Sequence, residues 1–145
     1  MKQDNIQFII NPDEINKYFE DFEHKSPFNL YKCFKEISKE YKMNGKELYY
    51  FLSLEIKTAY ENLKTNDYFY RSKIHYKIAI IKYRMKDDTS NHGKSKGWRI
   101  IALIDEINGL FYLLEMYKHS KGKDNLTNDE KNKIKLFCDE YAMNV

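Results

Sequence analysis

Residues 98–118 read WRIIALIDEINGLFYLLEMYK and determine the fold class of this chain. Two apolar runs, 98–105 and 110–118, lie on either side of Asn108 and Gly109. An Asn-Gly pair between apolar runs is one of the strongest short signals for a β-hairpin. We therefore expect two antiparallel strands, and the remaining elements are arranged around them.

The pairing of these strands decides which side chains meet at the open end of the hairpin. A two-residue turn would place Arg99 opposite Lys118 and Ile100 opposite Tyr117, whereas a one-residue bulge would place Arg99 beside Tyr117. Two cations directly opposite each other repel unless an anion lies between them. In either register we expect Arg99, Tyr117, Lys118 and His119 to cluster at one end.

The residues before the hairpin alternate in the same way. Over 74–85 one face carries Ile74, Tyr76, Ile78, Ile80, Lys82 and Arg84, which predicts a third strand antiparallel to 98–105. Its charged end then lies near Arg99, and Lys94 and Lys96 approach from the polar loop 86–96. We expect a basic concavity suited to phosphate contacts and to stacking of unpaired bases.

The N-terminal half predicts one short strand and three helices. Residues 6–10 alternate as a strand, and Asn11 with Pro12 begins a helix that we expect to reach about residue 23. Ser26-Pro27 begins a second helix, which Asn44-Gly45 stops. A third helix follows and ends near residue 64, where Asn66-Asp67 marks a turn.

Thr127-Asn128-Asp129-Glu130 fits a capping box, and Ile134, Phe137, Cys138 and Tyr141 form the apolar stripe of a last helix. The expected fold is α+β, with helices on one face of a small, mostly antiparallel sheet made of the N-terminal strand and a three-strand meander. We expect one domain, 1–145, in which 1–73 holds the N-terminal strand and helices and 74–145 holds the meander and the C-terminal helix.

Composition indicates a globular, cytoplasmic protein. The chain has 145 residues, 42% hydrophobic and 32% charged, and no apolar run approaches the ~18 residues of a membrane span. The N-terminus lacks a signal-peptide pattern. Cys33 and Cys138 are expected to be reduced core residues. Scattered histidines and missing phosphate-loop motifs predict no metal and no cofactor.

Charge is distributed unevenly along the chain. Residues 71–99 carry nine basic and two acidic side chains, a net charge of +7, whereas residues 1–23 carry two basic and six acidic ones, a net charge of −4. Such asymmetry is typical of a nucleic-acid binder, and the alternative is a solvated lysine-rich surface. Arg99 could also pair with Glu115 or Asp105, Tyr117 could be a core aromatic, and His119 could be an exposed loop residue.

From about Tyr76 onward the chain resembles the RelE/ParE toxin superfamily of bacterial toxin–antitoxin systems. The resemblance is carried by Gly97-Trp98-Arg99-Ile100-Ile101, by Tyr112-Leu113-Leu114, by Tyr117-Lys118-His119-Ser120, and by Leu126-Thr127 before an amphipathic helix. It covers about half of the chain. The N-terminal half departs from the family pattern, which has two helices before the meander where this chain predicts three.

The resemblance implies a metal-free endoribonuclease that cleaves messenger RNA on the ribosome, with the 2′-hydroxyl attacking the adjacent phosphate, and that is masked by an antitoxin protein. It implies that Arg99 stabilises the phosphate, that Tyr117 stacks a base or orients the hydroxyl, and that Lys118 or His119 moves the proton. Lys82, Arg84, Lys94 and Lys96 would hold the RNA. The alternatives are a ParE-like DNA gyrase inhibitor and a non-enzymatic phage or plasmid protein that binds nucleic acid or a partner.

Overall fold

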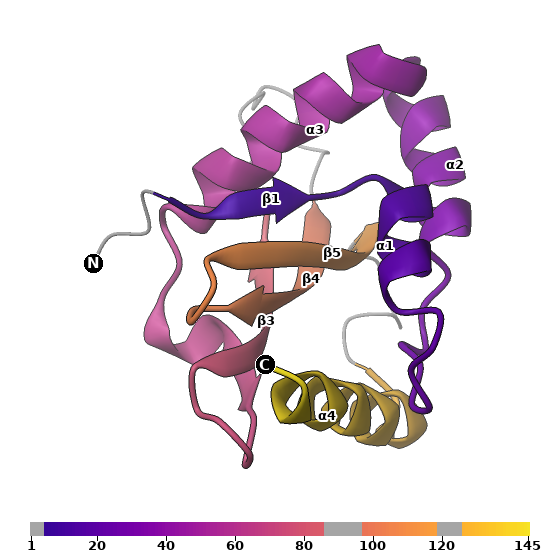
Figure 1. The fold of residues 1–145 in the computed structure, drawn as a ribbon. Helices are drawn as coiled ribbons and strands as arrows, with labels where there is room; N and C mark the ends of the chain where they lie inside the picture. Colours follow the sequence, from indigo (N-terminus) through magenta and orange to yellow (C-terminus); the bar gives the residue numbers. More distant parts are fainter. Residues whose placement is uncertain (1–4, 86–96, 119–125) are drawn as a thin grey trace.

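A five-stranded sheet runs through the centre of the computed structural model, which describes residues 5–85, 97–118 and 126–145. The strands lie in the order β1-β5-β4-β3-β2 (Figure 1). They are β1 (Gln7–Ile9), β2 (Tyr68–Arg71), β3 (Ile78–Arg84), β4 (Trp98–Asp105) and β5 (Leu110–Lys118). Only the β1–β5 pair is parallel among these described strands. The α+β fold with a mostly antiparallel sheet is thus confirmed.

Helices cover both faces of the sheet, so the expectation of one covered face was wrong. The helices are α1 (Pro12–Tyr18), α2 (Leu30–Tyr41), α3 (Gly45–Tyr60) and α4 (Asn128–Met143), with a 3-10 turn at Thr65–Asp67. Tyr83 on one face donates a hydrogen bond to Ile56 O of α3, and Asp105 on the other accepts one from Tyr141 of α4. The reason is that Ile80 and Ile81, on opposite faces of β3, are both fully buried, and an apolar face must be covered.

The first helix begins as expected but ends early. Asn11 Oδ1 accepts from Asp13 N at 2.9 Å, and Pro12 takes the first helical position, as the N-cap preference predicts. The helix ends at Tyr18 rather than near residue 23. Just beyond the helix, Lys25 Nζ donates to the carbonyl oxygens of Phe19 and Glu20.

The boundaries of the next two helices differ from the expected ones because local caps decide them. Helix α2 begins after Asn29, whose Oδ1 accepts from Lys32 N at 3.1 Å, rather than at Ser26-Pro27. It ends at Tyr41, and the capping residue Lys42 adopts φ 56°. Asn44 is the residue before α3, so the Asn-Gly pair begins a helix instead of stopping one.

The sequence did not predict strand β2. It pairs with β3 antiparallel, from Arg71↔Ala79 to Tyr68↔Ile81. Strand β3 begins at Ile78 rather than at residue 74, because residues 72–77 connect β2 to β3. Ile74 and Tyr76 are 53% and 64% exposed. They lie in a turn in which Ser72 Oγ accepts from Ile74 N. Because β1 pairs with β5 and β2 with β3, residues 1–73 and 74–145 share one sheet.

The bounds of the 98–118 hairpin are those predicted, but its turn is longer. Asp105 pairs with Leu110, so residues 106–109 form a four-residue connection and the two-residue turn was wrong. Asp105 Oδ1 accepts from the backbone N–H of Ile107 and of Asn108, each at 2.9 Å. The buried Asp105 carboxylate therefore stabilises the 106–109 turn by accepting these backbone hydrogen bonds.

The C-terminal helix forms as predicted. Thr127 Oγ1 accepts from Glu130 N and Glu130 Oε1 accepts from Thr127 N, each at 3.0 Å, which confirms the capping box. Cys33 and Cys138 are both free and buried, and burial raises the pKa of Cys138 to about 12. None of the helices in the described ranges is long and apolar enough to cross a membrane.

Candidate nucleic-acid interface

Three predicted site residues form one row across the sheet. Arg99 pairs directly with Arg84 of β3 on one side and with Tyr117 of β5 on the other. Directly paired residues in antiparallel strands project from the same face. Of the two registers considered for the hairpin, the structure has the one that places Arg99 beside Tyr117. It arises from a shift inside the hairpin, between Ile101 and Ala102, rather than from a bulge at the turn.

The next row on this face holds Lys82, Ile101 and Glu115. Ile101 is fully buried, Lys82 and Glu115 are half-buried, and Arg84 in the first row is exposed. Lys82, Arg99, Glu115 and Tyr117 each make an interaction within the folded chain. Arg84 and Arg99 carry like charges at directly opposed positions, an arrangement that costs stability. An anion bound between them would relieve this repulsion.

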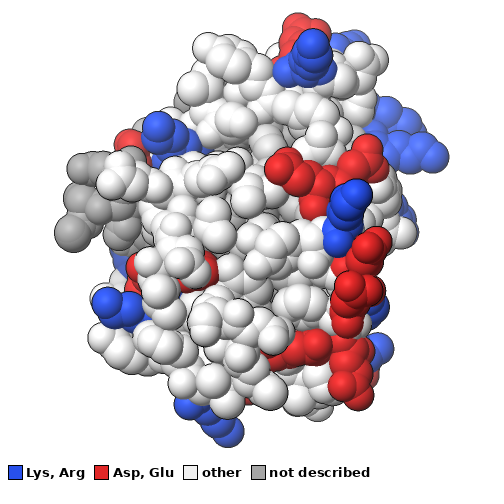
Figure 2. Space-filling view, in the orientation of Figure 1, with Lys and Arg blue, Asp and Glu red and all other residues white. Residues whose placement is uncertain are grey.

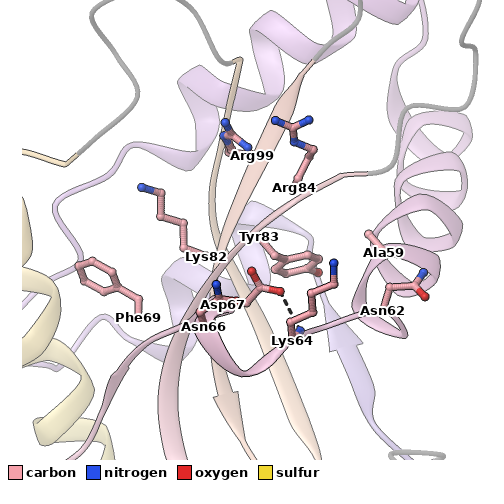
Figure 3. A pocket seen from close by; sticks show the side chains of 10 residues that line it. All are labelled: Ala59, Asn62, Lys64, Asn66, Asp67, Phe69, Lys82, Tyr83, Arg84 and Arg99. Atoms are coloured by element: carbon pink, nitrogen blue, oxygen red, sulfur yellow. Dashed lines mark hydrogen bonds between the residues drawn. The ribbon is translucent and has the colours of Figure 1, made fainter.

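A pocket of about 930 Å³ opens at this end of β3 (Figure 3). Its lining combines four cationic side chains with one carboxylate, two amides and two aromatic rings. These residues are Lys64, Lys82, Arg84, Arg99, Asp67, Asn62, Asn66, Phe69 and Tyr83, together with Ala59. The lining therefore favours an anionic ligand with flat, apolar parts, which is the chemistry of a nucleotide.

The carboxylate of Asp67, the acidic residue of the pocket, is hydrogen-bonded to the backbone of the turn that contains it. Asp67 Oδ2 accepts from Lys64 N at 2.8 Å, and Asp67 N donates to Lys64 O at 2.9 Å. These two bonds close the turn between α3 and β2. One carboxylate oxygen is thus turned toward the chain itself, while the side chain of Lys64 remains exposed.

Sequence reasoning missed Lys64, Asn66 and Phe69 as site residues. It read residues 64–67 only as the exit from a helix, because β2 was not recognised. The four residues of β2 are all partly or fully exposed, so they show no apolar alternation. A signal was nevertheless present, since a lysine and two asparagines precede the aromatic run 68–70.

The structure places Lys118 on the other face, away from Arg99 and Tyr117. Lys118 pairs with Trp98, and successive residues of a strand point to opposite faces. Its Nζ lies 2.9 Å from Glu40 Oε2 of α2 and 5.9 Å from the centroid of the Trp98 ring. The expected cluster at one end of the hairpin is therefore divided between two faces. His119, Lys94 and Lys96 lie outside the described residues.

Acidic side chains gather elsewhere on the molecule. Figure 2 shows them along the side formed by α1 and the segment that follows it. The sequence places Asp13, Glu14, Glu20, Asp21 and Glu23 there, all exposed. None of them lines the pocket at β3. The uneven charge of the sequence thus corresponds to separate surfaces, and only the basic one suits a polyanion.

The comparisons leave the family open. No family model, no curated protein and no solved structure matches this chain. Within the described ranges, no three His, Cys, Asp or Glu side chains converge as metal ligands would. The resemblance to the RelE/ParE superfamily therefore stays a prediction, and we infer the function from the arrangement of charged and aromatic side chains.

Proposed function

We propose that this protein is the toxin of a toxin–antitoxin pair, an endoribonuclease that cleaves messenger RNA on the ribosome. The observation that carries the proposal is the row Arg84–Arg99–Tyr117, with Lys82 in the next row of the same face. Two arginines placed directly opposite each other are costly for folding and useful for holding a phosphate. The resemblance of residues 76–145 to the RelE/ParE superfamily points to the same chemistry.

In the proposed reaction the 2′-hydroxyl of the RNA attacks the adjacent phosphorus, and the bond to the 5′-oxygen of the next nucleotide breaks. The attacking hydroxyl loses a proton and the leaving oxygen gains one. Negative charge builds up on the phosphate oxygens in the transition state. Arg84 and Arg99 are suited to stabilise it because planar guanidinium groups donate paired hydrogen bonds to phosphate.

Proton transfer needs a further group beside the arginines. Tyr117 adjoins Arg99 and carries a phenolic hydroxyl, which can donate to the leaving oxygen while its ring stacks on a base. Lys118 is less suited to this role, because it lies on the opposite face and pairs with Glu40. His119 follows on the chain, and an imidazole titrates near neutrality.

A toxin of this kind requires a protein partner that masks it in the cell. The exposed acidic residues of α1 and the following segment offer a surface to a basic partner segment, and a partner covering β3 would block the pocket directly. We expect a cytoplasmic protein that contacts messenger RNA, the ribosome and its antitoxin.

The test is cleavage of messenger RNA in a purified translation system, with cut sites mapped by primer extension. We expect wild-type cuts that fall by about 100-fold or more with Arg99→Ala, the usual loss when one transition-state donor is removed. Lys46→Ala is the matched control, because Lys46 is an exposed lysine at the far end of α3 from the pocket.

Two results would contradict the proposal. One is an absence of ribosome-dependent cuts with folded wild-type protein, and the other is a folded Arg99→Ala variant that cuts normally. Inhibition of DNA gyrase by the wild-type protein, without RNA cleavage, would instead support the ParE-like alternative.

A further inference from the structure

Beyond Ile81, the edge of strand β3 beside the pocket pairs with no other strand in the described part of the chain. Its pairing with β2 stops at Ile81, three residues before the strand ends at Arg84. Met85 N donates to Trp98 O at 2.8 Å, so the odd-numbered positions direct their backbone groups toward β4. In an antiparallel strand these directions alternate. The backbone N–H and C=O of Arg84 therefore point toward the edge that forms a wall of the pocket.

The pocket extends around this edge rather than lying on one face. Lys82 and Phe69 lie on one side of β3, and Lys64 and Tyr83 lie on the other (Figure 3). Tyr83 is held in place by the bond from its hydroxyl to Ile56 O of α3. A ligand that fills the pocket must therefore cross the edge of the strand.

We propose that residues 64–69 form a second nucleotide subsite, next to the phosphate site of Arg84 and Arg99. An unpaired RNA strand would cross the edge of β3 there, with one base against Phe69 and a neighbouring phosphate on Lys64. This inference depends on the proposed function, because it takes the two arginines as the site of the cleaved phosphate. It assigns a role to the turn between α3 and β2.

The chemistry of the subsite favours a single strand. Phe69 is half-buried, so one side of its ring is supported by the core and stacking would order little further. Lys64 is exposed, and Asn66 adds an exposed amide that can bond to a sugar or a base edge. Single-stranded RNA can bend around the edge of β3, whereas an RNA duplex is stiff over so short a distance.

Binding is tested with a single-stranded oligoribonucleotide methylated at every 2′-oxygen, which cannot react and so reports binding alone. Fluorescence anisotropy at several salt concentrations gives the affinity and its salt dependence. Lys64→Ala is expected to lower the slope of log K against log salt by about 0.7, the value for one lost phosphate contact on a single strand. Lys46→Ala is expected to leave the slope unchanged.

The stacking contact is tested with Phe69→Leu, which keeps an apolar side chain in the core. We expect affinity to fall by roughly five-fold or more, because stacking of one base contributes at least about that much. Thermal unfolding checks that the variant is folded. If it is not, Lys64→Ala decides alone, since Lys64 is exposed and makes its turn bonds through its backbone.

The subsite is disproved if Lys64→Ala binds like Lys46→Ala, if an RNA duplex binds as tightly as the single strand, or if a mononucleotide does. Cleavage by the wild type that is unaffected by Lys64→Ala and by a folded Phe69→Leu would remove the subsite and leave the proposed function standing. If single-stranded RNA binds in a way that depends on Lys64 but no assay shows cleavage, the subsite is supported and the proposed nuclease activity is rejected.

Discussion

Arg84 and Arg99 place two like charges beside each other in the sheet. Each projects from the same face at directly opposed positions, where opposite charges would stabilise the strand pair and like charges weaken it. Asp105 does not relieve the repulsion, because its Oδ1 bonds to the 106–109 turn and its Oδ2 to Tyr141 at 2.6 Å. Arg99 and Glu115 each make an interaction within the folded chain, and two opposed guanidinium groups are in addition suited to hold an anion.

This leads to a prediction in which stability and activity move in opposite directions. Arg84→Gln should raise the free energy of unfolding by about 0.2–1 kcal/mol at low salt, since it removes one of two facing like charges, while RNA cleavage falls. The gain should shrink at high salt, where surface charges are screened. Urea unfolding and the translation assay measure the two effects. A less stable or fully active variant would contradict this account, with Lys46→Gln as the charge-matched control.

At the scale of residues, the sequence predicted part of the side-chain arrangement correctly. Period-two alternation is a local property, so it brought Lys82 and Arg84 to one face and toward Arg99 without knowledge of the fold. The same alternation puts Lys118 and Tyr117 on opposite faces, and the expected cluster ignored this. The composition of the segment before residues 68–70 was a signal for Lys64 and Phe69, but their position beside Arg84 follows only from the pairing of β2 with β3.

At the scale of elements, the hairpin shows how a turn and a bulge together decide a site. The four-residue connection and the shift between Ile101 and Ala102 combine to place Tyr117 beside Arg99. A hairpin with the two-residue turn would have placed Lys118 there. The register is thus the step at which a local signal for a hairpin becomes a particular arrangement of side chains.

Gly109 connects this turn to strand β1. It adopts φ +70°, a conformation that costs a residue with a Cβ, and an added Cβ would lie 3.2 Å from Asn5 O. Its carbonyl also accepts from Gln7 N at 2.8 Å. We predict that Gly109→Ala lowers the free energy of unfolding by about 1–3 kcal/mol, since left-handed strain and the close contact add. Urea denaturation measures it.

Gly45 supplies the control for this change. It has a similar φ of +57°, but a Cβ there meets no atom within 4 Å. Gly45→Ala should therefore cost less than Gly109→Ala. Equal losses would show that the approach of β1 has no effect on the turn.

At the scale of the whole molecule, α4 connects segments that are far apart in sequence. Asp139 accepts from the hydroxyls of Ser72 and Tyr70 at 2.7 and 2.9 Å. Glu140 accepts from the backbone N–H of Glu23 and His24 at 2.9 and 2.7 Å. One helix thus bonds both to the end of edge strand β2 and the turn after it and to the segment after α1, which follows the other edge strand, β1.

Glu140 makes this connection dependent on pH. Burial opposes its ionisation, but the hydrogen bonds from Glu23 and His24 and the nearby charges of His24 and Lys25 outweigh that effect, so its pKa lies below the usual 4.5. A lowered carboxylate pKa contributes stability that is present above the unfolded value and is lost as pH falls through the folded value.

We therefore predict that Glu140→Gln is less stable than the wild type at pH 7. The difference should shrink as pH falls from the usual 4.5 through the lower pKa of the folded state, and it should vanish where the carboxylate is protonated in both states. Thermal unfolding at pH 7, 5 and 3 measures the difference. Glu36→Gln, at an exposed carboxylate on α2, should show no such trend. A difference that persists unchanged at pH 3 would mean that the hydrogen bonds do not depend on the charge.

The sequence by itself determined the α+β class, the bounds of the 98–118 hairpin, the capping box of α4 and the basic face of β3. Each follows from residues close together on the chain, through alternation, turn chemistry or a cap. Tertiary structure decided the register that brings Tyr117 to Arg99, the recruitment of β2 and the covering of both faces. These depend on pairing and burial between residues distant in sequence, where packing outweighs local preference.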